Sequence, residues 1–425
     1  MTGANSRDRE LRERAEAVIP GGMYGHQSVA LLPDDYPQFF ARGEGAHLWD
    51  VDGRRYLDLM CAYGPNLFGY ANPEIDAAYV RQLGLGDTLT GPTPLMVELA
   101  EALVGMVGHA DWAMFCKNGT DATSMALVVA RAHTRRKTVV RAKGAYHGAA
   151  AWCTPRPAGV VDSDRAHQLF CDYNDVASLE AAVAQAGDDL ACIFAAPFRH
   201  DAFVDQADPD PAYARRAREL CDATGALLVV DEVRAGFRLT RDVSWSRIGV
   251  QPDLSSWGKC LANGHALSAL LGGDKARAAA ASVYVTGSFW YEAAPMAAAL
   301  ETLRLIRETD YLERITALGA RLRDGLAERA AAAGFGFRQT GPATMPLFLF
   351  DEDPDLRKGF CFASEMLARG VYVHPWHNMF LCAAMTEADI EAALDAAEGA
   401  FGALKRQAGG LPPVDKLAFL SAGAR

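Results

Sequence analysis

The chain has 425 residues, enough for two domains, and half of them are hydrophobic while 22% are charged, which is typical of globular proteins. Its formal net charge of −11 argues against binding to a nucleic-acid backbone, because no basic surface is available to replace the phosphate counterions.

The nine cysteines are scattered along the chain and include no Cys-x-x-Cys pair. An odd number without metal-ligand spacing is typical of reduced thiols, so we expect a cytoplasmic protein without a metal site. The polar segment 1–16 does not resemble a signal peptide, and no apolar run approaches the length of a membrane span. We therefore expect no membrane association.

The N-terminal part predicts a helix over 7–18, which stops at Pro20-Gly21-Gly22. A β-hairpin is expected over 47–56, because Asp52-Gly53 between alternating apolar residues is a strong turn signal. From about Asn72, helical stretches alternate with short apolar runs. The helices are expected near 73–84, 93–106, 120–134, 176–186 and 210–223. The strands are expected at 112–116, 138–141, 191–195, 226–230 and 268–271.

Strands separated by helices predict a mainly parallel sheet with both faces covered. After about residue 300 the pattern changes to that of an α+β cap. It predicts, in order, amphipathic helices at 296–307 and 311–332, two strand-like runs, a helix near 361–369, strands near 371–373 and 379–383, and a helix at 386–404.

Three loops at expected carboxyl ends of strands carry candidate chemistry, since ligands of open α/β sheets collect there. The first is Asn118-Gly119-Thr120, where glycine, a hydroxyl and the free N–H groups of a helix N-terminus suit a phosphate. Taken alone, this segment is more often an ordinary N-cap.

The second loop follows the buried strand that ends at Asp231. A carboxylate there can hold the N–H of a pyridinium ring, although capping of the next segment or metal binding is equally consistent with it. The third contains Gly258-Lys259, where a lysine of lowered pKa could form an imine; a lone loop lysine is usually a surface residue.

Together and in this order, the three loops supply the parts that a pyridoxal 5′-phosphate (PLP) site needs: a phosphate-binding segment, an acid for the ring nitrogen and a lysine for the imine. Tyr146, in Gly144-Ala-Tyr-His-Gly148, could stack on the ring or could be a core tyrosine.

The segment Asp231-Glu-Val-Arg-Ala-Gly-Phe-Arg238 followed by Gly258-Lys259 resembles the class III (subgroup II) aminotransferases, most closely the glutamate-1-semialdehyde aminomutase-like branch. The resemblance extends from Ile19 to about Phe401. Further matching segments are Arg42–Ala46, Leu48–Gly53, Gly64-Pro65, Tyr146-His147-Gly148 and Met296–Leu303.

This resemblance implies the fold of type I PLP-dependent transferases. The large domain would hold a mainly parallel seven-stranded sheet, and a smaller α+β domain would be built from the N- and C-terminal segments. We place the N-terminal segment of the small domain at 1–60, the large PLP-binding domain at 61–305 and the C-terminal part of the small domain at 306–425.

The resemblance also implies PLP as cofactor, bound as a Schiff base on Lys259, with Asp231 at the ring nitrogen. Gly119 and Thr120 would bind the phosphate, with Asn118 where the family usually has Ser, and the Tyr146-His147 segment would lie at the ring. The enzyme would be a homodimer with active sites at the subunit interface, where Ser288 reaches the neighbouring subunit's phosphate.

Several segments depart from the family pattern and count against glutamate-1-semialdehyde as the substrate. The family's usual Glu-Pro is Ala196-Pro197, and Ser28 stands where the aminomutases have an arginine that recognises a carboxylate. Candidate substrate residues are Tyr24, His26, Arg234, Trp290, Trp376 and His377. Each aromatic residue among them is, taken singly, more often part of the core, and a solvated salt bridge is at least as consistent with Arg234.

We therefore expect an aminotransferase that moves an amino group between a small amino compound and a carbonyl acceptor. The alternatives are a glutamate-1-semialdehyde-type 2,1-aminomutase, a racemase or a decarboxylase on the same fold. A non-catalytic PLP-fold binding protein is the alternative from another class. A nicotinamide-dependent dehydrogenase is disfavoured, because the chain has no Gly-x-Gly-x-x-Gly between a first strand and helix.

Overall fold

A seven-stranded sheet organises the larger of two units in the computed structural model, which describes residues 6–407 and 409–417. The strands lie in the order β4-β10-β9-β8-β7-β5-β6, and of these β10 runs antiparallel to both its neighbours. They are β4 (Trp112–Cys116), β5 (Thr138–Ala142), β6 (Gln168–Cys171), β7 (Leu190–Ala195), β8 (Leu227–Asp231), β9 (Leu254–Trp257) and β10 (Ser268–Gly272). The expected mainly parallel seven-stranded sheet is thus confirmed.

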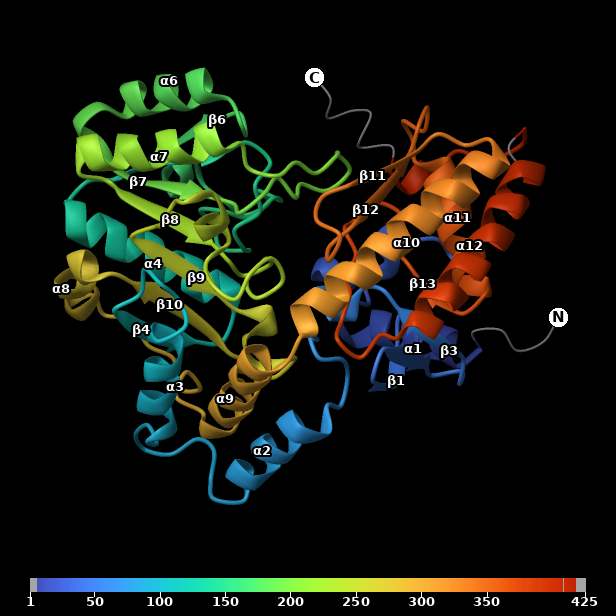
Figure 1. Cartoon of the computed structure of the whole chain (residues 1–425), viewed down its shortest axis with the longest axis horizontal. Helices are drawn as coiled ribbons and strands as arrows, with labels where there is room; N and C mark the ends of the chain where they lie inside the picture. The colour runs from blue at the N-terminus through green and yellow to red at the C-terminus, as the bar shows by residue number, and fades with distance from the viewer. Residues whose placement is uncertain (1–5, 408, 418–425) are drawn as a thin grey trace. The chain divides into compact units, whose positions relative to one another are not determined.

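Helices cover both faces of this sheet. The connection from β4 to β5 contains α4 (Gly119–Thr134), whereas α6 (Val176–Ala186) and α7 (Pro211–Thr224) connect β6 to β7 and β7 to β8. These two connections cross the sheet in the direction opposite to the first. Because crossovers between parallel strands are right-handed, α4 covers one face and α6 and α7 cover the other. Figure 1 shows α6 and α7 side by side.

Helix α4 illustrates why the sequence folds in this way. Its buried side chains recur at the spacing of one helix face, at Ala122, Met125, Ala126, Val129 and Ala130. They form a buried apolar cluster with strand residues such as Val139, Phe194 and Val229. The remaining helices of this unit are α2 (Pro73–Leu83), α3 (Leu95–Val104), α5 (Asp162–Arg165), α8 (Asp274–Ser282) and α9 (Ala293–Glu308).

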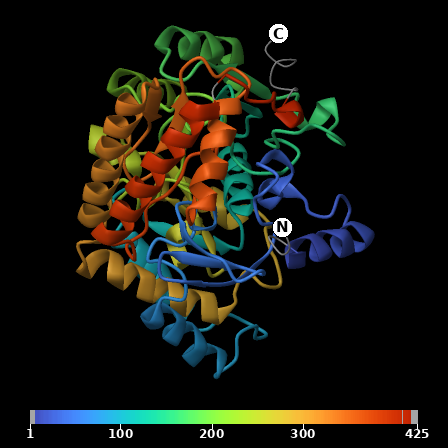
Figure 2. The same cartoon turned by 90° about the vertical axis from the view of Figure 1, so that its right-hand side faces the viewer.

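Among the described residues, the second unit comprises 6–63, 68–72, 313–407 and 409–417. Its four-stranded sheet has the order β1-β2-β3-β13, in which the predicted hairpin is β2 and β3. Helices α11 and α12 pack against each other, as the red helices in Figures 1 and 2 show. The elements are α1 (Ser6–Val18), β1 (Phe40–Glu44), β2 (His47–Asp50), β3 (Arg55–Asp58), α10 (Tyr311–Ala333), β11 (Phe337–Thr340), β12 (Leu347–Phe350), α11 (Arg357–Ala368), β13 (Val371–Tyr372) and α12 (Glu387–Gln407).

The strand expected near 379–383 does not form. The N–H groups of Met379 and Leu381 donate to Pro346 and Thr344, at 2.7 and 3.0 Å, whereas that of Phe380 donates to Leu59 at 2.7 Å. Successive residues thus bond to two different segments, so no continuous ladder develops. None of the helices within 6–407 and 409–417 is long and apolar enough to cross a bilayer.

Candidate active site

The carboxyl ends of β4, β5, β7, β8 and β9 meet at one edge of the large sheet. Strands β5, β7, β8 and β9 run parallel to one another. Strand β10 is antiparallel to both β9 and β4, so β4 runs in the same direction as the parallel strands. Asp231 pairs with Ser256 in the register of β8 and β9. Lys259 therefore follows only three residues beyond the partner of Asp231, and the structure brings these two predicted residues to the same edge.

Lys259 opens a short 3₁₀ turn directly after β9 and has a left-handed backbone, with a φ of 44°. Such a conformation is strained in a residue other than glycine and occurs often at functional sites. The backbone before it is tightly packed, since a Cβ atom on Gly258 would lie 2.7 Å from the Ser268 hydroxyl.

The surroundings of Lys259 favour its neutral amine. Desolvation lowers the pKa of Lys259 to about 7, and the charge of Arg234 adds to this effect while Asp231 opposes it. The side chain remains half-buried, between the buried residues Gly258 and Cys260. A neutral amine near pH 7 can act as a nucleophile or as a base.

Asp231 ends β8 and is 5% exposed. Its Oδ2 accepts a hydrogen bond from His147 Nδ1 at 2.7 Å, and its Oδ1 accepts one from the N–H of Val233 at 3.1 Å. These bonds hold the carboxylate at the sheet edge. His147, predicted as part of the Tyr146-His147 segment, thus contacts the Asp231 carboxylate. Its buried Nε2 has no hydrogen-bond partner within the described residues.

The neighbouring acid, Glu232, has a different environment. Its two carboxylate oxygens accept bonds from the N–H and the hydroxyl of Ser244, at 2.6 and 2.5 Å. Burial raises the pKa of Glu232 to about 7. Asp231 therefore lies at the site, whereas the carboxylate of Glu232 holds the segment around Ser244 in place.

The segment Asn118–Thr120 forms the start of α4. The N–H groups of Gly119 and Thr120 lie in the first helical turn, where no acceptor exists within the helix. Glycine is required at 119, because a Cβ atom there would lie 2.5 Å from Val233. The Asn118 N–H donates to Asp121 at 2.8 Å, which closes the turn. The predicted phosphate-binding loop thus abuts the loop after Asp231.

Tyr146 lies in the loop after β5 and is 40% exposed. Partial burial raises its pKa, and Arg234 acts in the opposite direction. The end of this loop contacts the α4 terminus, since the Ala149 N–H donates to Thr120 Oγ1 at 3.1 Å and a Cβ atom on Gly148 would lie 2.6 Å from the same oxygen. The end of the loop that carries Tyr146 is therefore held against the Asn118–Thr120 segment.

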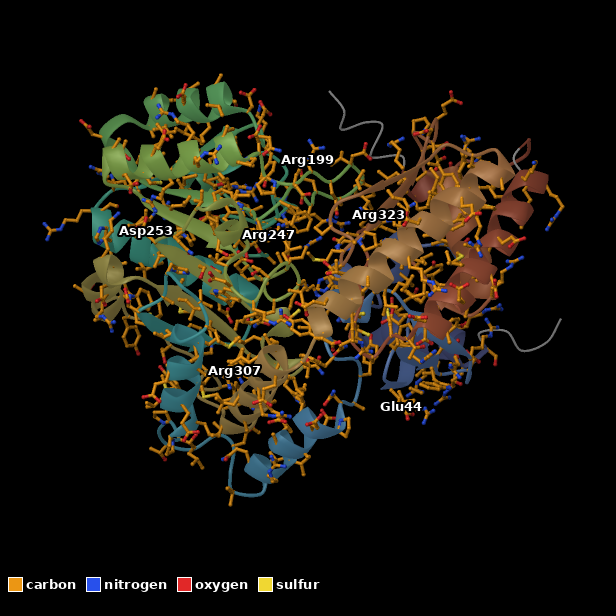
Figure 3. All side chains as sticks on the ribbon, in the orientation of Figure 1. Glu44, Arg199, Arg247, Asp253, Arg307 and Arg323 are labelled. Carbon is orange, nitrogen blue, oxygen red and sulfur yellow. The ribbon has the colours of Figure 1, made fainter. Side chains whose placement is uncertain are left out.

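Sequence reasoning missed two polar residues at this edge, His200 and Asp201, which follow Arg199 in the loop after β7. Arg199, labelled in Figure 3, donates to the Asp205 carbonyl at 3.1 and 2.6 Å. Asp201 lies against Gly144, whose Cβ atom would be 2.6 Å from a carboxylate oxygen. The available signal was their position in the loop that follows a buried strand.

Two other candidates lie in the segment before α9. Ser288 is exposed, whereas Trp290 packs beside the buried cluster under α4. Gly287 permits this packing, because a Cβ atom there would lie 2.4 Å from Trp290 Nε1. Trp290 thus has a packing role of its own.

The remaining candidates belong to the second unit. The rings of His26 and His377 contact that of Tyr63, with centroids 4.8 and 5.4 Å apart, and Trp376 lies 6.4 Å from His377. Tyr24 is 74% exposed. Tyr63, which sequence reasoning also missed, has a φ of 64° in a left-handed turn and stands directly before the quoted Gly64-Pro65 motif.

This arrangement fits PLP. One edge of the sheet carries the Lys259 amine, whose pKa is lowered, and the Asp231 carboxylate, which hydrogen bonds hold in place. The glycine-containing N-terminus of α4 lies at the same edge, and Arg234 is half-buried there. Within the described ranges, no group of three or more His, Cys, Asp or Glu side chains could hold a metal ion. The lysine amine can hold an organic cofactor that carries an aldehyde.

Comparisons with known proteins agree with this chemistry. Residues 32–398 match the family model for class-III aminotransferases. The chain is 59% identical over 408 residues to an aminopentol aminotransferase of Sphingopyxis macrogoltabida, covering 96% of this chain and 97% of that protein. It is 33% identical over 429 residues to a glutamate-1-semialdehyde 2,1-aminomutase of Bordetella avium (strain 197N), covering 94% and 100%.

A solved structure of the FumI protein of Sphingopyxis sp. MTA144, in its PLP internal aldimine form, has the same fold. The TM-score is 0.96 at 58% identity, and the match covers 97% of this chain and 100% of that one. The chain belongs to the class-III aminotransferases and is a PLP-dependent aminotransferase.

Proposed function

We propose that this aminotransferase takes the amino group from an aminopentol, an amine with several hydroxyl groups, and passes it to a carbonyl acceptor. One observation carries this choice of substrate. The chain is 59% identical over nearly its whole length to an aminopentol aminotransferase, against 33% to a glutamate-1-semialdehyde aminomutase. The aminomutase activity expected from that branch is therefore the weaker candidate.

The purified, PLP-loaded enzyme tests this proposal. We expect aminopentol alone to convert the cofactor to pyridoxamine phosphate in a single turnover, followed by absorbance spectroscopy, and a keto acid to restore the starting spectrum. Glutamate-1-semialdehyde supplied alone distinguishes the alternative, because a mutase converts it to an isomer without any acceptor. Isomerisation of that compound, with no response to aminopentol, would refute the proposal.

We propose that Lys259 and Asp231 perform the central steps. When bound, PLP supplies an aldehyde that condenses with amines and a ring that withdraws electrons. Lys259 Nζ holds the cofactor before substrate arrives and then accepts the proton from the carbon that carries the substrate's amino group. The Asp231 carboxylate, aligned by His147 Nδ1, holds the proton on the ring nitrogen.

We further propose that the N–H groups and the hydroxyl of Gly119 and Thr120, with Asn118, bind the phosphate, and that Tyr146 stacks on the ring. Arg234 is half-buried beside Asp231 and Lys259, and burial lowers its pKa to about 10. It therefore stays charged at neutral pH and suits an anionic oxygen. Tyr24, His26, Trp290, Trp376 and His377 remain candidates for substrate contacts.

The lowered pKa of Lys259 predicts the pH dependence of cofactor capture. Only the neutral amine attacks an aldehyde. The fraction of neutral Lys259 rises with pH until the pH exceeds its pKa of about 7. In the cofactor-free protein, we expect the rate of PLP capture to rise between about pH 6 and 8 and then to level off. Stopped-flow absorbance measures this rate. An increase of about tenfold per pH unit continuing to pH 10 would contradict the lowered pKa.

We also propose a homodimer. Five exposed apolar residues gather in two segments of the larger unit, Leu85 (80% exposed), Leu89 (52%), Val97 (60%), Tyr284 (92%) and Phe289 (60%). The Ala293 and Ala294 N–H groups bond Asp87 at 3.1 and 2.7 Å, which ties the segments together. Such patches mark interfaces, and Ser288 lies within this one. Sedimentation as a species of 45.7 kDa would exclude the dimer.

We propose a cytoplasmic location on the basis of the thiols. None of the nine cysteines is in a disulfide, which supports a cytoplasmic enzyme. Labelling with a thiol reagent after unfolding, without reductant, should modify all nine, and protection of any pair would contradict a reducing compartment.

A further inference from the structure

Lys117 stands directly before the proposed phosphate-binding segment, and the proposed chemistry gives it no role. It follows β4 and precedes Asn118. Its Nζ forms an ion pair with Glu292 Oε2 at 2.6 Å and donates to the Ala266 carbonyl at 3.0 Å. The two charged side chains are only 12% and 21% exposed, so solvent screens this pair less than the ion pairs on the open surface. Loss of either side chain would leave an enclosed charge without its partner.

The contacts of Lys117 extend to the loop after the proposed Schiff-base lysine. Ala266 belongs to the loop between Lys259 and β10. The Ser268 hydroxyl, at the start of β10, donates to the Lys117 carbonyl at 3.3 Å. Ser268 also limits the space at Gly258, where a Cβ atom would lie 2.7 Å from its hydroxyl oxygen. The side chain and the backbone of Lys117 therefore both bond the segment that packs against the residue before Lys259.

Glu292 is a fixed partner for Lys117. It directly precedes α9 and follows Ser288 by four residues. Its other carboxylate oxygen, Oε1, accepts a hydrogen bond from Thr88 Oγ1 at 3.4 Å. Thr88 lies in segment 85–89, which carries two of the exposed leucines. The ion pair thus joins the phosphate-binding segment to two segments that are themselves bonded to each other.

We propose that Lys117 is a positioning residue for the cofactor's phosphate. Its ion pair with Glu292 and its bond to Ala266 hold the Asn118–Thr120 segment in the arrangement that receives the phosphate. Fixing this segment in advance lowers the entropy lost on binding. Lys117 Nζ has a carboxylate and a carbonyl as acceptors, so its contribution is to fix the backbone that follows it. The inference rests on the phosphate-binding role proposed for Asn118–Thr120.

PLP and pyridoxal, which lacks the phosphate, separate an effect on the phosphate site from a general effect on the fold. Both are aldehydes that the Lys259 amine can hold, and absorbance titration of the cofactor-free protein measures both dissociation constants. We expect Lys117→Met to raise the Kd of PLP by roughly 10- to 30-fold and that of pyridoxal by less than about twofold. An equal loss for both ligands, or no loss for PLP, would overturn the inference.

Glu292→Gln tests the sign of the effect. If Lys117 acted only through its charge, removing the neighbouring negative charge would strengthen the attraction for an anionic phosphate and lower the Kd of PLP. In a positioning role, the neutral amide holds the ammonium group less firmly than the carboxylate does. We therefore expect the Kd of PLP to rise by roughly 3- to 10-fold. A lower Kd of PLP in this variant would overturn the inference.

Two further variants show whether the pair acts as a unit. Lys117→Met/Glu292→Gln should lose no more PLP affinity than Lys117→Met alone, whereas additive losses would overturn the inference. Lys143→Met is the matched control, because Lys143 bonds Asp172 at 2.9 Å at the same sheet edge but these side chains are 61% and 55% exposed. It should change the Kd of either ligand by less than about twofold. A PLP-specific loss as large as that of Lys117→Met would contradict the positioning role.

Thr120→Val distinguishes failure of the inference from failure of the proposed phosphate site. Its hydroxyl oxygen accepts a bond from the Ala149 N–H, which leaves the hydroxyl proton available to a phosphate. We expect this variant to raise the Kd of PLP and not that of pyridoxal. An unchanged Kd of PLP would refute the proposed phosphate site and the inference together. A PLP-specific loss in Thr120→Val but not in Lys117→Met would refute the inference alone.

Discussion

Lys259→Ala should lower kcat for amino transfer by at least about 10⁴-fold, because the substitution removes both the amine that holds the cofactor and the base that takes the substrate proton. Steady-state turnover with an amine and a keto acid measures the loss. The variant should also lack the absorbance of a lysine-bound cofactor, which a spectrum of the PLP-treated protein shows directly.

The fold should survive this substitution. Burial lowers the pKa of Lys259 to about 7, which means that the folded protein disfavours the charged amine, so its removal is not expected to lower the Tm. Lys275→Ala is the control, because that side chain is 42% exposed on α8 and bonds Asp253 at 3.3 Å. A Lys259→Ala enzyme that kept full transaminase activity would refute the assignment.

Asp231→Asn should reduce kcat by roughly 10²- to 10³-fold, the range found when a preorganised polar partner is removed from a reacting group. The amide carries no charge to stabilise a protonated ring nitrogen. It keeps an oxygen that can accept from His147 Nδ1, now at 2.7 Å. The variant should therefore fold normally, and single-turnover spectra should place the loss in proton removal rather than in substrate binding.

Asp231→Ala separates the two roles of this carboxylate. It leaves the buried Nδ1 of His147 without an acceptor, so we expect a loss of about 1–3 kcal/mol in the free energy of unfolding in addition to the loss of activity. Asp222→Asn, at a side chain that is 63% exposed on α7, should change neither quantity. Equal activity of Asp231→Asn and wild type would show that the ring nitrogen has another partner.

The large sheet was predictable because most of its strands and helices have a local sequence pattern, an apolar run or an amphipathic repeat. The helix expected at 176–186 coincides with α6, and the strand expected at 112–116 coincides with β4. Strands β1 and β6 were not predicted. Both are partly exposed; β1 contains polar residues such as Arg42, and β6 has only three apolar residues in a row, too few to mark a strand.

The active-site residues also fall into two groups, those that local motifs predict and those that they do not. Lys259 and Asp231 were found because each follows a strand within a recognisable motif. The positions of His200 and Tyr63 depend on loops that are shaped by distant partners, such as the bond from Trp245 to Pro197. A left-handed turn over Cys61, Ala62 and Tyr63 likewise has no glycine within it to reveal it in the sequence.

The antiparallel strand β10 has a consequence for the order of assembly. It inserts between β4 and β9, pairing Ser268 with Cys116 and Ala269 with Trp257. The loop that would grip the phosphate follows β4, whereas the lysine follows β9, and the two strands join one sheet only through β10. Residues 268–272 must therefore be synthesised before the sheet can be continuous between the phosphate-binding segment and the lysine, so the sheet beneath this part of the pocket is completed only after Lys259 itself has been made.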